Sequence, residues 1–296
     1  MIEYSAPHTG EDFAILKHVA GAYIPIKECC TMFGFLSLSR VKSLGQLLKH
    51  GITRYMNIIL FDKRPEEDLI PMSDERARHM KKILKVVPGD QVLMGLIDGL
   101  MGNATVKEIS EEGVRIDWEP TLESTPFSPV ELVVAQVRPI CMKRILREAV
   151  SLGVRKIHVV GADTAEKSYA RSHLWTKGEY KSYLLHGATQ SVSTKIPECI
   201  TYRSVDQLDF DDIPTRILLD NIHPAGDIMD IPISEPVVLA IGPERGWTDR
   251  ERAVFTDRGF CSVGMGDRVL RTETACSAGL GIIIGRLRLV ALETHL

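Results

Sequence analysis

The sequence predicts an α/β protein in which a domain built on a mainly parallel sheet follows a small β-rich domain. Two observations predict this fold class. Over residues 56–120, short apolar runs end at turns that contain glycine, as strands joined by hairpins do. Over residues 131–296, strand-like apolar runs alternate with helical segments, which favours a parallel sheet with helices on both faces. Residues 121–130, which include Pro126 and Pro129, are predicted to be a linker.

The β-rich domain is expected to contain a helix among its strands. Strands are predicted at residues 57–61, 90–98, 103–109 and 114–119, and hairpins between them suggest a small barrel. Ser73, Asp74 and Glu75 give the helix an acidic start, and its end is basic, as the helix dipole favours.

The parallel-sheet domain is expected to begin with a strand at residues 131–137. A helix follows from about Cys141 to Leu152, where Gly153 ends it. A strand at residues 156–161 and a helix near Trp175 to Gly187 come next, and further strands are predicted at residues 217–220 and 237–242.

The stretch from residue 239 to residue 284 carries the densest set of turn and capping signals. The strand ends at Gly242-Pro243, and Thr248 with Glu251 predicts a capping box for a helix that Gly259 ends in a left-handed conformation. A second apolar segment, residues 260–265, leads into a Gly-Met-Gly loop, and the last helix starts after it. If these strands are neighbours, their loops converge on one ligand-sized place.

Composition limits the classes of protein that the sequence suits. The 44% of hydrophobic residues in 296 residues suits two ordinary globular domains, and no apolar run is long enough to span a membrane. The six cysteines show no metal-ligand or disulfide spacing, so we expect no metal site and a reduced, cytoplasmic location. A net charge of −3 argues against a broadly basic surface, so any RNA contact must come from local patches.

Two basic patches are candidates for contact with RNA phosphates, which cations position without reading sequence. A solvated helix face is the alternative interpretation of each. The first patch lies in the β-rich domain and the second at the first helix of the parallel-sheet domain: Arg76, Arg78, Lys81, Lys82, Lys85; Arg138, Lys143, Arg144, Arg147.

Two motifs in the last stretch carry a resemblance to a known family. The elements IGPERGW and GDRVLRTETA resemble the GPEGG and LG-x-R-[IV]-L-R-T-E-T-A motifs of ribosomal-RNA uridine-N3 methyltransferases of the RsmE type, a branch of the SPOUT class. The resemblance covers residue 56 to the C-terminus. It implies a PUA-like RNA-binding β-barrel domain followed by a SPOUT domain with a C-terminal trefoil knot.

The resemblance also implies a homodimer that uses S-adenosylmethionine to methylate N3 of a uridine in 16S ribosomal RNA of the small subunit. It implies that the strand-end loops and the start of the last helix hold the cofactor. The residues expected there are Leu219, Ile241, Gly242, Pro243, Glu244, Gly246, Met265, Gly266, Val269, Leu270, Thr272, Thr274 and Ala275.

Three residues at the start of the last helix are candidates for the chemistry. Arg268 or Arg271 could stabilise negative charge that develops on the uracil carbonyls. Glu273 is the nearest candidate base, and a role in charging the helix start is equally compatible with its position. The small residues of the last helix suit either a dimer interface or a close-packed core.

Other functions are possible interpretations of the same residues. Gly264-Met265-Gly266 lacks the third glycine of a dinucleotide fingerprint, so an NAD enzyme is disfavoured. A non-catalytic RNA-binding protein with this fold, or a divergent enzyme with another RNA target, remains an alternative. The chain departs from the family at Arg245, where the second turn glycine is expected, and around Thr189-Gln190, Ser193 and Lys195.

Residues 1–55 lie outside the resemblance and show no clear period. They are expected to be either a wrongly assigned upstream start or a genuine extension, and no function is assigned to them.

Overall fold

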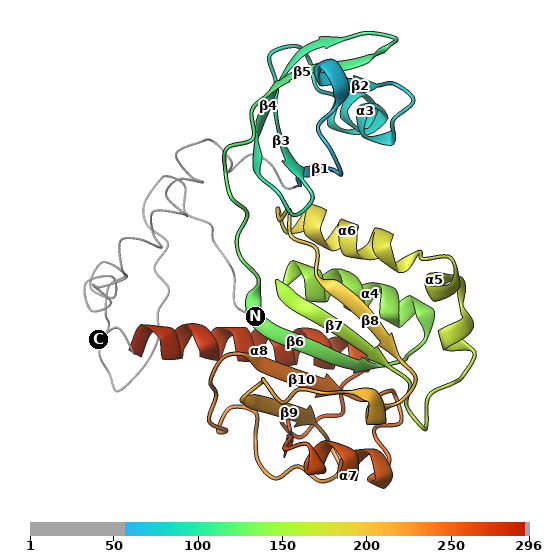
Figure 1. Cartoon of the computed structure of the whole chain (residues 1–296), viewed down its shortest axis with the longest axis vertical. Helices are drawn as coiled ribbons and strands as arrows, with labels where there is room; N and C mark the ends of the chain where they lie inside the picture. Colours follow the sequence, from blue (N-terminus) through green and yellow to red (C-terminus); the bar gives the residue numbers. More distant parts are fainter. Residues whose placement is uncertain (1–56, 294–296) are drawn as a thin grey trace, which may run out of the picture. The chain divides into compact units, whose positions relative to one another are not determined.

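The computed structural model describes residues 57–293, with the side chains of residues 57–290. The interpretations of residues 1–55 fall outside the described part of the chain. The described residues form a five-stranded sheet and a six-stranded sheet, the second alternating with helices (Figure 1). The predicted α/β class, with a β-rich part before a parallel sheet, is confirmed.

The first sheet is open rather than a closed barrel. Its strand order is β1-β3-β4-β5-β2, and in the described residues no pairing joins β1 to β2. Strand β1 runs parallel to β3, and β2 pairs with β5 instead of closing the sheet. The predicted barrel is therefore corrected to a curled, mixed sheet around a core that includes Trp118 and Met80. The strands are β1 (Ile59–Phe61), β2 (Leu69–Pro71), β3 (Gln91–Leu96), β4 (Met101–Ile109) and β5 (Gly113–Trp118).

The helix predicted in this part is shorter than its basic residues suggested. A one-turn helix, η2 (Glu66–Asp68), precedes β2, and α3 (Glu75–His79) follows it. The Asp74 side chain caps α3 by accepting a hydrogen bond from the Arg76 N–H at 2.8 Å. A π-helical turn, η3 (Met80–Leu84), continues the chain and ends at Lys85, whose φ is +52°. The basic residues thus lie on a short irregular segment.

The second sheet is parallel throughout, in the order β11-β9-β10-β6-β7-β8. Strand β6 begins inside the predicted linker, and the edge strand β8, only partly buried, was not predicted. The helix expected near residues 175–187 is two helices, because Gly178 breaks it with a φ of +69°. The strands are β6 (Ser128–Ala135), β7 (Val154–Val160), β8 (Glu198–Tyr202), β9 (Thr215–Leu219), β10 (Val237–Ile241) and β11 (Cys261–Val263).

Helix α8 lies along the sheet and packs on β6, β10 and α4 (Figure 1). A Cβ on Gly279 would lie 3.0 Å from Leu239 and 3.1 Å from Leu219, so glycine permits this close approach. No described helix is both long and apolar enough to cross a membrane. The helices of this part are α4 (Pro139–Ser151), η4 (Tyr169–Arg171), α5 (His173–Thr176), α6 (Tyr180–Gln190), η5 (Val205–Gln207), α7 (Asp249–Asp257) and α8 (Thr272–Glu293).

A buried polar network ties β6, β7 and β8 together. The Glu131 carboxylate accepts from Arg155 at 2.7 Å and lies 2.7 Å from His158 Nε2, while His158 Nδ1 lies 3.1 Å from the Tyr202 hydroxyl. Burial opposes the charged form of Glu131, but the hydrogen bonds from His158 and Arg155 outweigh burial and lower the pKa of Glu131. The network therefore stabilises the sheet only while Glu131 is ionised.

We predict that Glu131→Gln lowers the free energy of unfolding at pH 7 by roughly 2–3 kcal/mol, because it disrupts a buried charged network. A lowered pKa contributes stability above the unfolded value of about 4.3, and this contribution is lost as the pH falls through the folded value. Urea unfolding at a series of pH values should show the deficit shrinking in acid. The control Glu198→Gln removes a surface ion pair between Glu198 and Lys156. Because the Glu198 side chain is 61% exposed, this change should alter the free energy of unfolding by about 0.5 kcal/mol or less. A deficit for Glu131→Gln that is equally large at pH 3 would contradict this account.

Candidate active site

The loops predicted to form the site follow β10 and β11, which lie in the same parallel sheet with β9 between them. Strands β6, β10, β9 and β11 are adjacent and parallel, so their carboxyl ends meet at one edge. From β6 the chain continues to β7 on one side, while β10 lies on the other side. A crevice outside the carboxyl ends of strands that diverge in this way is the usual ligand site of a parallel α/β sheet.

The turn after β10 is held by backbone geometry that glycine makes possible. Gly246 has a φ of +69°, and its N–H donates to the Pro243 carbonyl at 2.8 Å. A Cβ on Gly242 would lie 3.2 Å from the Trp247 indole, so the ring packs directly on the turn. The only left-handed residue of turn 242–247 is Gly246, so the bulky Arg245 is accommodated without backbone strain.

The predicted capping box fixes this turn to the next helix and to the loop after β7. Thr248 and Glu251 make both reciprocal bonds of the box at the start of α7. The fully buried Glu251 carboxylate also accepts from the Asp163 N–H at 2.9 Å, and the Thr164 hydroxyl donates to the Gly246 carbonyl at 3.0 Å. The turn is therefore supported from two sides before any ligand binds.

The loop after β11 leaves room and apolar surface at the crevice. The Gly264 N–H donates to the Gly226 carbonyl at 2.8 Å, which fixes the beginning of the loop. Gly266 has a φ of +77° with open space where a Cβ would lie. Val269 and Leu270 are 80% and 37% exposed, an unusual state for two adjacent aliphatic side chains. These predicted cofactor residues present apolar surface that a ligand could cover.

The start of α8 is joined directly to the turn after β10. The buried Thr272 hydroxyl donates to the Gly242 carbonyl at 3.2 Å. Arg268 and Arg271 are exposed beside this contact, and Glu273 is half-buried. The structure thus brings the IGPERGW and RTETA elements together, although β9 separates the two strands that precede them.

The crevice has a second wall, formed after β6, that sequence reasoning did not assign to it. The pKa of the Cys141 thiol is raised by burial first, and then by the nearby Glu273 and Glu244 carboxylates. The pKa of Arg138 is raised by its hydrogen bond with Tyr169 and by the charge of Glu244. Arg138, predicted to contact RNA, therefore lies close to Glu244, predicted to contact the cofactor.

Cys141 and Tyr169 were not identified from the sequence as site residues. Their signal was positional: each lies shortly after the carboxyl end of a parallel strand, β6 or β7. Without knowledge of the strand order, that position alone does not distinguish them from other loop residues.

The first basic patch contains one cation that is already paired. Arg76 donates to Asp74 at 2.6 Å and to the Leu60 carbonyl at 2.9 Å, and its guanidinium lies 4.0 Å over the Phe61 ring. Its charge is balanced by Asp74, whose pKa is lowered chiefly by this hydrogen bond. The remaining members of the patch are exposed: Arg78, Lys81, Lys82 and Lys85.

The second basic patch is divided in a similar way. Lys143 of α4 lies 3.7 Å from the Glu179 carboxylate and 5.0 Å from the Tyr183 ring centroid, so its charge already interacts with neighbouring side chains. Arg138, Arg144 and Arg147 are exposed.

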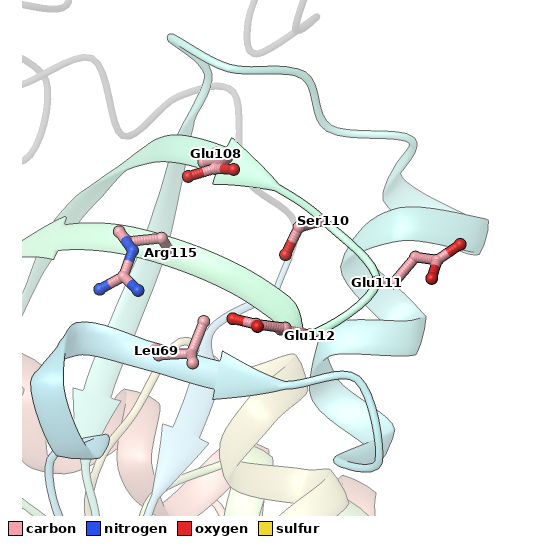
Figure 2. A pocket seen from close by; sticks show the side chains of 6 residues that line it. All are labelled: Leu69, Glu108, Ser110, Glu111, Glu112 and Arg115. Carbon is pink, nitrogen blue, oxygen red and sulfur yellow. The ribbon is translucent and has the colours of Figure 1, made fainter.

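A separate cavity in the first sheet has a different chemistry. Its volume is about 390 Å³, and Figure 2 shows its lining around Arg115 and Leu69. Glu108, Glu111 and Glu112 make the lining acidic, and none of the predicted cofactor or RNA residues is part of it. In the described chain, no group of three or more His, Cys, Asp or Glu side chains is placed to hold a metal ion.

Comparison with known proteins gives a family for the chain. Residues 123–284 match the family model of an RNA methyltransferase domain. The chain is 33% identical over 241 residues to the ribosomal RNA small subunit methyltransferase E of Treponema pallidum, covering 77% of this chain and 91% of the relative.

Solved structures share the fold. A ribosomal RNA small subunit methyltransferase E from Neisseria gonorrhoeae, bound to S-adenosylmethionine, matches with a TM-score of 0.62 and 20% identity over 78% of this chain and 98% of its own. A putative methyltransferase from Legionella pneumophila, in complex with S-adenosylmethionine, matches with a TM-score of 0.64 and 23% identity over 78% and 96% of the two chains.

We predict that Gly246→Ala lowers the free energy of unfolding by about 1–2 kcal/mol, because a Cβ disfavours the left-handed conformation. Arg245→Ala, one residue earlier at an exposed position outside the left-handed region, should change stability by about 0.5 kcal/mol or less. Urea unfolding of both variants checks the assignment. Equal losses for the two variants would mean that the turn is not held as the structure shows.

Proposed function

The chain belongs to the RsmE family of RNA methyltransferases, and from this membership we propose that it methylates N3 of a uridine in small-subunit ribosomal RNA. It is an S-adenosylmethionine-dependent 16S ribosomal RNA methyltransferase of that type. The observation that carries the proposal is the Thr272–Gly242 hydrogen bond, which joins the two family motifs at one crevice.

The residues at the crevice fit an adenosyl cofactor. Gly266 offers open space for close approach, and the exposed Val269 and Leu270 offer apolar surface for the adenine. Backbone groups of the Gly242–Glu244 turn, which Thr272 joins to the start of α8, can hydrogen-bond to the cofactor. When bound, S-adenosylmethionine supplies a methyl group that its positive sulfur activates toward attack.

The arginines beside α8 support the chemistry at the acceptor base. Uracil N3 carries its proton at neutral pH, so methylation requires that the proton leave and that negative charge on the flanking carbonyls be stabilised. Arg271 and Arg268 are exposed at this place and can donate hydrogen bonds to those oxygens. In this proposal Arg271 stabilises the developing charge.

Glu273 is the proposed acceptor of the N3 proton. Its carboxylate lies beside Cys141, whose raised pKa keeps the thiol protonated and able to donate to Glu273. The Cys141 thiol would orient the Glu273 carboxylate and leave the second carboxylate oxygen free to accept the N3 proton of the uracil. This contact favours a role in the site over one limited to charging the helix start.

The basic residues outside the crevice are proposed to hold the RNA. Arg78, Lys81, Lys82 and Lys85 would neutralise phosphates from the first sheet, and Arg138, Arg144 and Arg147 would do so beside the crevice. A target base that is paired or stacked must be extruded to reach the methyl group. The ribosomal substrate implies a cytoplasmic enzyme.

A homodimer is part of the proposal because α8 has surface left over. Positions of a Cβ on Gly281 and Gly285 meet no atom of the described residues within 4 Å, and Leu289 is 60% exposed. Gly279 on the same helix packs on the sheet. The small residues of α8 therefore suit both a close-packed core and a dimer interface. Small residues allow the backbone of a second helix to approach closely.

The departures from the family around residues 189–195 support the alternative of a different target uridine. Ser193 lies 3.3 Å from the Ser124 hydroxyl, and Lys195 Nζ donates to the Asp98 carbonyl at 3.4 Å. These side chains therefore make contacts within the protein. An altered RNA-contacting surface changes which nucleotide is presented, without changing the cofactor crevice.

We predict that Arg271→Ala lowers the rate of methyl transfer to small-subunit RNA by about 100-fold or more, because a donor to developing negative charge is lost. Its stability should change by about 0.5 kcal/mol or less, since the side chain is exposed. Transfer of labelled methyl groups, followed by nucleoside analysis for N3-methyluridine, measures the effect. Arg115→Ala, an exposed arginine of β5 that lines the acidic cavity and belongs to none of the proposed contacts, is the control and should keep the wild-type rate. An unchanged rate in Arg271→Ala would remove this residue from the chemistry.

We predict that Lys81→Glu combined with Lys82→Glu weakens RNA binding about tenfold or more and reduces its dependence on salt, because fewer counterions are released. Affinity for small-subunit RNA at several salt concentrations checks this. The control pair, Lys63→Glu with Lys107→Glu, reverses two exposed charges elsewhere on the same sheet and should leave the salt slope nearly unchanged. If both pairs have the same effect, the patch is an ordinary solvated surface.

A further inference from the structure

Gln136 lies at the carboxyl end of β6, directly beside the crevice. Its N–H donates to the Val160 carbonyl at 2.7 Å, so pairing with β7 continues one residue beyond the strand. The register pairs Val134 of β6 with Ile241 of β10, and side chains two residues apart along a strand share a face. Gln136 therefore lies on the same face as Val134, next to the turn that follows Ile241.

That face of the sheet is the one covered by α8. Leu132 pairs with Leu239, and Leu239 lies 3.0 Å from the position of a Cβ on Gly279 of α8. The first turn of α8 reaches the end of β10 through the Thr272–Gly242 bond. Gln136 is thus placed below the start of α8, where the two family motifs meet.

The Gln136 side chain has an unused hydrogen-bonding group. The residue is 6% exposed, and its Nε2 is buried with no hydrogen-bond partner among the described residues. A buried amide without a partner costs free energy, so such a group in a native fold needs an explanation. Trp247, another residue near this edge with an unpartnered buried nitrogen, packs its ring into the apolar core on the opposite face.

We infer that the Gln136 amide donates a hydrogen bond to the adenosine part of the bound cofactor. The inference rests on the proposed function. A buried neutral amide suits an uncharged acceptor, such as a ribose hydroxyl or an adenine ring nitrogen. The charged amino-acid end of the cofactor is better matched by the ionic groups of the crevice, Arg138 and Glu244. The terminal amide torsion is soft, so the amide can turn its donors toward the crevice.

Replacement of Gln136 by a side chain of similar size without donors tests the inference. Isothermal titration should give a dissociation constant about tenfold higher for Gln136→Met than for the wild type, with S-adenosylmethionine and equally with 5′-methylthioadenosine. Methylthioadenosine lacks the amino-acid end, so an equal loss assigns the bond to the adenosine part. Without ligand, its unfolding temperature should be unchanged or higher, because the unpaired amide is gone.

The control Gln190→Met makes the same change at the exposed end of α6 and should bind both ligands like the wild type. Gln136→Leu serves as a second variant if Gln136→Met does not fold. Wild-type affinity in Gln136→Met, or a loss seen with S-adenosylmethionine but not with methylthioadenosine, overturns the inference. Absence of binding by the wild-type protein would instead contradict the proposed function itself.

Discussion

The close approach of α8 to the parallel sheet is the constraint on which the site depends. A Cβ at position 279 would lie 3.0 Å from Leu239 and 3.1 Å from Leu219, so glycine lets the helix lie close to these side chains. With the helix axis fixed there, Thr272 reaches the Gly242 carbonyl at 3.2 Å, and Arg271 and Glu273 are carried to the ends of β6 and β10. A packing requirement in the core thereby determines where the candidate chemical groups lie.

Rigidity on the other side of the crevice has a separate origin. Glu251 completes the cap of α7 and also binds the loop after β7, so one buried carboxylate connects the turn after β10 to a second loop. The backbone groups expected to meet the cofactor are therefore held before it binds, which lowers the cost of ordering them. The exposed Val269 and Leu270 are the part of the crevice left for a ligand to cover.

The features that were predicted from the sequence depend on local chemistry. The capping box of α7, the left-handed Gly259 and the strand β10 each follow from a few adjacent residues, and all three are present. The open edge of the first sheet was not predicted, because it depends on which distant strands pair. The pairing of Arg76 with Asp74 and the placement of Gln136 were not predicted for a related reason. The partners of a side chain depend on which residues surround it in the fold, and neither composition nor hydrophobic periodicity specifies them. The trefoil knot and the roles of the site residues stay predictions.

The most direct test of the account is isothermal titration of the purified wild-type chain with S-adenosylmethionine, with NAD in parallel. We expect saturable binding of S-adenosylmethionine at one site per chain and no binding of NAD, because the third glycine of the dinucleotide fingerprint is absent here. Binding of NAD, or of neither ligand, would contradict the assignment of the crevice at the ends of β6 and β10 to an adenosyl methyl donor.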